Sequence, residues 1–137
     1  MTPVGSGTEL DRAYGIGRAH EATLSADARR DGAHYTPVDV AEGLVARAFD
    51  LLGDRSGDSP PRCWDPSSGG GVFLVAMAEA LWRRGVDPRT VVERCVVGVD
   101  LDPGAVRASR AALVAWAAAR GVDEVEPDVR VGDGLAT

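Results

Sequence analysis

The sequence predicts an α/β fold in which about three parallel strands alternate with helices. Apolar runs that end at Asp65 and Asp100, and a third around Val129–Val131, are typical of buried strands. Apolar residues at helical spacing separate them, near 71–84 and 103–120. Because repeated βα units form parallel sheets with right-handed crossovers, we expect the ends of these strands to lie along one edge. The strand that ends at Asp100 should be buried on both faces.

Composition limits what the chain does. It has 137 residues, 45% of them hydrophobic, which suits one domain or part of one. The net charge is −6, so the chain alone is a poor nucleic-acid binder, and DNA would need a basic surface elsewhere. No apolar run reaches the roughly 18 residues that span a bilayer, and no signal peptide is apparent. We expect a cytoplasmic protein without a metal site, in which Cys63 and Cys95 are buried free thiols.

The N-terminal segment, residues 1–30, is expected to be distinct from the main domain, residues 31–137. Its first eight residues look disordered. The rest predicts one or two helical pieces, interrupted by Gly15 and Gly17. Its apolar face is thin, so the segment should pack on something else.

A helix is predicted after residue 36. Thr36 is a plausible N-cap, with Pro37 at the first helical position and Asp39 in the first turn. The residues that repeat at helical spacing and should form a buried face are Ala41, Leu44, Val45, Ala48 and Leu52.

The stretch from Cys63 to Leu74 reads as a short strand ending in an acid, then a glycine loop, then an apolar helix. Three glycines, Gly69–Gly71, let a ligand approach the backbone, and the helix start offers unpaired N–H groups. The acid Asp65 would repel a phosphate but suits a cation or a hydrogen-bond donor. The pattern therefore favours a nucleoside cofactor with a cationic part, which S-adenosyl-L-methionine fits.

Two other nucleotide sites are excluded. The nicotinamide fingerprint G-x-G-x-x-G fails because Leu74 occupies the third glycine position, and a P-loop needs a lysine, which the chain lacks. At the other strand ends, Asp100 suits two ribose hydroxyls. Asp133 either accepts from an adenine amino group or is only a turn residue between glycines. Leu101 and Leu135 are candidates to cover the ring.

Four motifs together carry a resemblance to a known family. They are Gly32-Ala33-His34-Tyr35-Thr36-Pro37, Asp65-Pro66-Ser67-Ser68-Gly69-Gly70-Gly71-Val72-Phe73-Leu74, Gly98-Val99-Asp100-Leu101-Asp102-Pro103 and Gly132-Asp133-Gly134-Leu135. In this order, over about residues 30–135, the chain resembles the N6-adenine DNA methyltransferases of restriction–modification systems. The resemblance implies a partial Rossmann-like class I fold that depends on S-adenosyl-L-methionine.

The resemblance also implies site residues. Tyr35 and Thr36 would help to hold the methionine end of the cofactor, and the loop from Asp65 would surround the sulfonium. Asp100 would bind the ribose, and Asp133 would face the adenine amino group. The residues expected to bind the cofactor are Tyr35, Thr36, Asp65, Ser67, Gly69, Gly71, Phe73, Asp100, Leu101, Asp133 and Leu135.

No catalytic residue is assigned to this chain. In the family, the catalytic tetrapeptide of Asp or Asn, two prolines and an aromatic follows a fourth strand. Ser59–Arg62 lacks both the acid or amide and the aromatic, so the chain alone should be inactive. We expect DNA as a partner of the complete enzyme, together with a further C-terminal part or a partner subunit. Without a fourth strand beside it, the first strand leaves an open edge prone to self-association.

Two alternatives remain open at this point. One is a fragment of an RNA or small-molecule methyltransferase, which would share the cofactor end. The other is a non-catalytic module that binds S-adenosyl-L-methionine without transferring its methyl group.

Overall fold

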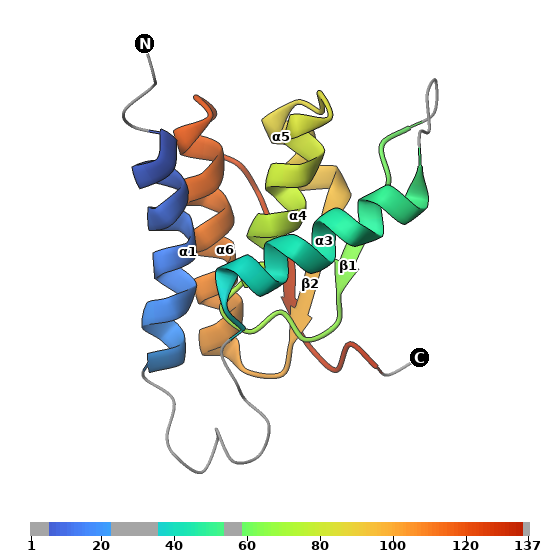
Figure 1. Cartoon of the computed structure of the whole chain (residues 1–137). Helices are drawn as coiled ribbons and strands as arrows, with labels where there is room; N and C mark the ends of the chain where they lie inside the picture. The colour runs from blue at the N-terminus through green and yellow to red at the C-terminus, as the bar shows by residue number, and fades with distance from the viewer. Residues whose placement is uncertain (1–5, 23–35, 54–58, 136–137) are drawn as a thin grey trace.

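The computed structural model describes residues 6–22, 36–53 and 59–135. In chain order (Figure 1) the elements are α1 (Ser6–Ala22), α3 (Val38–Leu52), β1 (Cys63–Asp65), α4 (Val72–Arg83), α5 (Pro88–Thr90), the π-helical turn η1 (Val91–Cys95), β2 (Val96–Asp100), α6 (Pro103–Ala119) and β3 (Asp128–Val131). In these ranges no helix is both long enough and apolar enough to cross a membrane.

The three strands form one parallel sheet in the order β1-β2-β3. Asp65 at the end of β1 pairs with Gly98, and Asp100 at the end of β2 pairs with Val131. All three strands therefore end at the same edge. The predicted α/β architecture with about three parallel strands is confirmed for the described residues.

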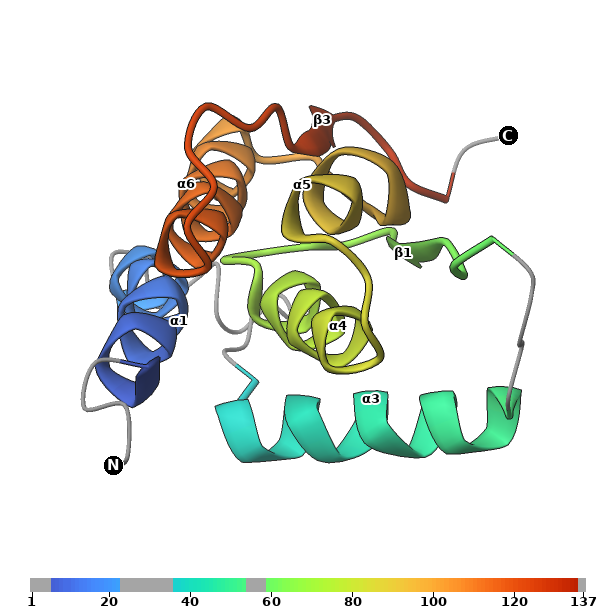
Figure 2. The same ribbon diagram turned by 90° about the horizontal axis from the view of Figure 1, so that it is seen from above.

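The long helices cover one face of this sheet. In Figure 2, which is seen from above and so roughly along the strands, α1, α3, α4 and α6 all lie on one side of the sheet. On the other face Trp64 is 57% exposed, and Val97 and Val99 are half-buried. The expectation that β2 is buried on both faces is wrong. The strands advance in one direction, so right-handed crossovers place α4 and α6 on the same side.

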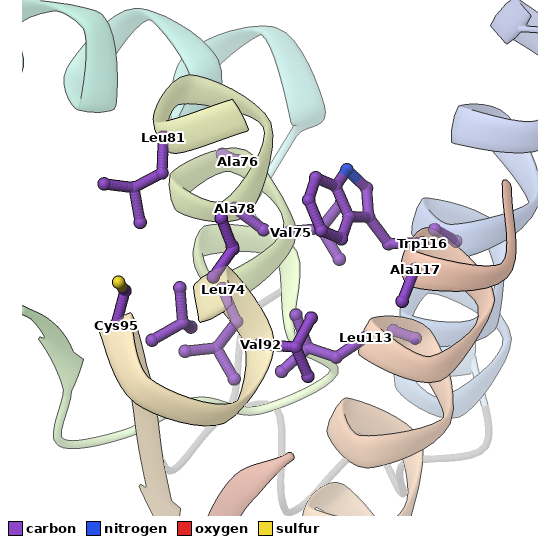
Figure 3. Packing of buried hydrophobic residues seen from close by; sticks show 14 of the residues in the cluster. Leu74, Val75, Ala76, Ala78, Leu81, Val92, Cys95, Leu113, Trp116 and Ala117 are labelled. Atoms are coloured by element: carbon purple, nitrogen blue, oxygen red, sulfur yellow. The ribbon is translucent and has the colours of Figure 1, made fainter. Parts of the chain in front are cut away.

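The core lies between α4, α6 and η1 (Figure 3). Its largest fully buried side chains include Leu74 and Leu81 of α4, Leu113 and Trp116 of α6, and Val92 of η1. Burying each leucine contributes about 1.5–3 kcal/mol, so this contact between two helices and the turn before β2 stabilises the fold by several kcal/mol. It fixes the helix starts relative to the strand ends.

Helix α1 runs unbroken through Gly15 and Gly17, so the predicted interruption is wrong. It packs antiparallel along α6 (Figure 1), with Ala13 and Gly17 buried. A glycine inside a helix costs about 1 kcal/mol relative to alanine, which tertiary contacts can outweigh. The prediction that this segment packs on another element is confirmed.

Helix α3 begins one residue later than predicted. Pro37 occupies the N-cap position and makes no side-chain capping bond, so Thr36 is not the cap. The buried residues of α3 are Ala41, Val45 and Phe49. Of the residues predicted to face inward, Leu44 and Leu52 are 56% and 43% exposed. The helix is therefore apolar over a wider arc than its contact with α4 covers.

Candidate functional site

Asp65 ends β1 and carries an unsatisfied buried oxygen. Its Oδ1 accepts a hydrogen bond of 3.0 Å from the backbone N–H of Ser67. Its Oδ2 is buried and has no hydrogen-bond partner in the described structure. Burial raises the pKa of Asp65; the Ser67 N–H lowers it, and the negative charge of Asp100 raises it further. Because buried carboxylate oxygens are rarely left without a donor, this atom suits a donor or cation from outside.

Asp100, at the end of β2, is held rigidly by two backbone N–H groups. Its Oδ2 accepts from Gly69, at 2.8 Å, and its Oδ1 accepts from Asp102, at 2.9 Å. A carboxylate has about four acceptor sites, so this half-buried group retains capacity for two more donors. The arrangement suits a pair of hydroxyls. The predicted cap of α6 is confirmed as Asp102, whose side chain accepts from the N–H of Gly104.

The glycine loop is packed from within the protein. Gly71 has a φ of +92°, and a side-chain carbon there would lie 3.1 Å from Cα of Ser109 on α6. At Gly70, such a carbon would lie 2.6 Å from the carbonyl oxygen of Gly17 on α1. The sequence suggested that these glycines admit a ligand to the backbone. The structure gives two of them another reason, which is the close approach of α1 and α6.

The loop after β3 returns toward the loop after β1. A side-chain carbon at Gly134 would lie 2.7 Å from Cα of Pro66, so the two loops touch. Asp133 is exposed and accepts from the N–H of Leu135, at 3.0 Å. Leu135 is 82% exposed and Leu101 is 72% exposed. This edge thus presents two apolar side chains that the described residues do not cover.

The remaining residues predicted to bind the cofactor have less direct relations to Asp65 and Asp100. Thr36 is half-buried just before α3, and none of the described hydrogen bonds joins it to Asp65 or Asp100. Phe73 is half-buried and packs against the core. Ser67 is exposed and contributes its backbone N–H to Asp65. Tyr35 lies outside the described residues.

Two hollows lie along α3, away from these groups. One of about 510 Å³ lies between α3 and α4, and one of about 740 Å³ is bounded by α3, Met77 and residues 59–63. None of the predicted cofactor-binding residues lines either hollow. The candidate site is therefore the exposed surface at the carboxyl ends of the strands, where charged and apolar groups lie. It is identified by the chemical character of these groups and not by a cavity.

Sequence reasoning missed two serines that support the site. Ser109 is fully buried, and its hydroxyl donates to the carbonyl of Gly69, at 2.8 Å. The hydroxyls of Ser109 and Ser68 lie 3.3 Å apart. The available signal was the run of small residues Ala105, Ser109 and Ala112 at helical spacing, which allows close packing on α6.

Comparison with known proteins gives one informative similarity. The chain is 30% identical over 122 residues to the Type I restriction enzyme MjaIX methylase subunit of Methanocaldococcus jannaschii. The matched region is 86% of this chain but 19% of that protein, so the chain spans about a fifth of its relative's length. No family model matches the chain.

Proposed function

We propose that this chain forms the S-adenosyl-L-methionine-binding part of a DNA adenine-N6 methyltransferase in a restriction–modification system. The observation that carries the proposal is the pair of acids at adjacent strand ends. Asp65 has a buried oxygen to which none of the described residues donates, and Asp100 is held by two N–H groups. Similarity to a methylase subunit of a Type I restriction enzyme supports it independently.

The chemistry of these residues fits the cofactor. S-adenosyl-L-methionine, when bound, supplies a methyl group on a positively charged sulfur. The carboxylate of Asp65 suits the cationic methionine end, and Asp100 has acceptor capacity for the ribose hydroxyls. Leu101 and Leu135 would cover the adenine ring, and Asp133 would accept from its amino group.

In the complete enzyme this chain would hold the methyl donor, and residues elsewhere would hold the target adenine. Positioning the two reactants supplies much of the acceleration in a reaction of this kind. The net charge of −6 makes DNA binding by this chain alone weak. We therefore assign DNA contact and base recognition to a further part of the enzyme or to a partner subunit.

Calorimetry with S-adenosyl-L-methionine and with NAD tests the proposal. We expect the former to bind and the latter not to bind, because Leu74 occupies the place of the third fingerprint glycine. The variant Asp123→Ala removes an acid from an exposed loop and should bind S-adenosyl-L-methionine as the wild type does. Absence of S-adenosyl-L-methionine binding, or tighter binding of NAD, would overturn the proposal.

We also infer that the isolated chain self-associates through β1. Within the described residues β1 pairs with β2 along one of its edges, which leaves the other edge unpaired. Unpaired strand edges are templates for pairing with another chain. Light scattering should give a mass above that of the 14.3 kDa chain. A monomer that melts cooperatively would contradict this inference.

A further inference from the structure

The glycine loop has an inner side that meets α1. A side-chain carbon at Gly17 would overlap the carbonyl of Gly70, and one at Gly70 would lie 2.6 Å from the oxygen of Gly17. Two backbones are therefore in direct contact, and neither position has room for a methyl group. Gly15, two residues earlier on the same helix, has nothing within 4 Å of such a carbon. The tight contact belongs to Gly17 and not to the glycines of α1 in general.

Gly69, the residue next to this contact, links the loop to the acid at the end of β2. The carbonyl of Gly69 accepts from the buried hydroxyl of Ser109, and its N–H donates to Oδ2 of Asp100, at 2.8 Å in each case. A shift of the loop at Gly70 would displace Gly69 and reorient its N–H group. That reorientation would weaken one of the two bonds that fix the carboxylate of Asp100.

Helix α1 also contacts Asp102, the residue whose N–H holds the other oxygen of the Asp100 carboxylate. His20 Nε2 lies 3.5 Å from Oδ2 of Asp102, and the N–H of Asp102 donates to Oδ1 of Asp100. Nearer the N-terminus of α1, the hydroxyl of Tyr14 donates to Glu42 of α3, at 3.3 Å. Thus α1 is anchored on α3 and contacts the neighbours of Asp100 at two points.

We propose that α1 is a positioning element of the cofactor site, and that Gly17 sets the glycine loop so that Asp100 is presented to the ribose. This inference rests on the proposed function, because it names the cofactor. With Gly17→Ala, the loop must move away from α1, and the binding-competent arrangement becomes a minor state. A competent fraction of about one tenth raises the apparent Kd about tenfold.

The test compares Gly17→Ala with Gly15→Ala, which adds the same methyl group to the same helix in open space. Calorimetry with S-adenosyl-L-methionine is run at a temperature where circular dichroism shows both variants to be folded. We expect about a tenfold loss for Gly17→Ala and wild-type affinity for Gly15→Ala. Equal affinities for the two variants would overturn the inference while leaving the proposed function intact. If the wild-type chain fails to bind, the proposed function itself falls.

A second variant covers the case in which Gly17→Ala does not fold. Tyr14→Phe removes the hydroxyl that anchors α1 on α3 and adds no atom. We expect faster hydrogen exchange at the amide of Gly69 and a smaller rise in Kd than for Gly17→Ala. Exchange and Kd both equal to those of the wild type would overturn the inference, because α1 would then be free to move without consequence for the loop.

Discussion

The two ends of the helical layer hold buried and half-buried acids in different ways. At the amino end of the sheet, Glu79 of α4 accepts from Trp116 at 3.0 Å and also from Arg120 and Arg83. At the carboxyl end, among the described residues, Asp65 has a buried oxygen without a donor, and the donors to Asp100 are backbone N–H groups. The acid at the amino end is paired by side chains, whereas the acids at the carboxyl end keep acceptor capacity that the described residues do not fill.

The pKa values follow this difference. Burial raises the pKa of Glu79, but hydrogen bonds from Arg120 and Trp116 and the charges of Arg120 and Arg83 outweigh it, so the pKa is lowered. The guanidinium of Arg120 also lies 4.2 Å from the centre of the Trp82 ring, and this ring further shields the guanidinium from solvent. For Asp65 burial prevails, and the pKa is raised. Paired acids of the first kind stabilise a fold, and unpaired acids of the second kind indicate a site.

The largest effect on stability should come from removing Glu79, the acid that is paired by side chains. Glu79→Ala leaves Arg120 buried without its carboxylate and should lower the free energy of unfolding by about 3–5 kcal/mol. Arg83→Ala, which removes a partner whose side chain is 69% exposed, should cost less than about 1 kcal/mol. Urea unfolding measures both. Similar losses for the two variants would show that the buried pair of Glu79 with Arg120 contributes no more than the exposed pair with Arg83.

The next effect should appear in binding rather than in stability. Asp100→Ala removes the acceptor for two donors, and bonds to a charged group contribute about 1.5–3 kcal/mol, so the Kd for S-adenosyl-L-methionine should rise about 10–100-fold. Calorimetry measures this rise, with Asp123→Ala as the control. If Asp100→Ala bound the cofactor with wild-type affinity, the carboxyl end of the sheet would not be the cofactor site.

The contributions of Asp65 and Glu79 to stability should depend on pH in opposite directions. Because the native pKa of Asp65 is raised, its contribution to stability falls as the pH rises from its ordinary value of 3.8 through the native value. The contribution of Glu79 is present above its ordinary pKa of 4.5 and is lost as the pH falls through its lowered value. Asp65→Asn should therefore be at least as stable as the wild type at neutral pH. Urea midpoints from about pH 3 to about pH 7 test this, and a less stable variant at neutral pH would contradict it.

The smallest effect should come from the apolar side chains at the open end. Leu135→Ala removes a side chain that is 82% exposed, so the melting temperature should stay close to that of the wild type. If this leucine covers the adenine ring, the Kd should rise by about fivefold to tenfold, equivalent to about 1 kcal/mol or slightly more. Val114→Ala, at an exposed site on α6, serves as the control. Equal binding by both variants would restrict the site to the acids.

The sequence alone determined the elements of this fold and the acids at the strand ends. The apolar runs and the helical spacing located the strands, the main helices and the α6 cap, because these depend on neighbouring residues. Sequence reasoning placed Asp65 and Asp100 correctly at strand ends for the same reason. It could not tell which face of β2 is covered, since that depends on the direction in which the strands advance.

Only the tertiary structure decided why the loop needs its glycines. From the sequence, Gly69–Gly71 admit a ligand, and Gly17 interrupts a helix. In the folded chain Gly17 and Gly70 are in contact, and Ser109 of α6 fills the space beside Gly71. Contacts between residues more than 35 positions apart follow from the packing of α1 and α6, which no local pattern encodes. The same packing holds Gly69, whose N–H donates to Asp100, and so shapes the candidate site.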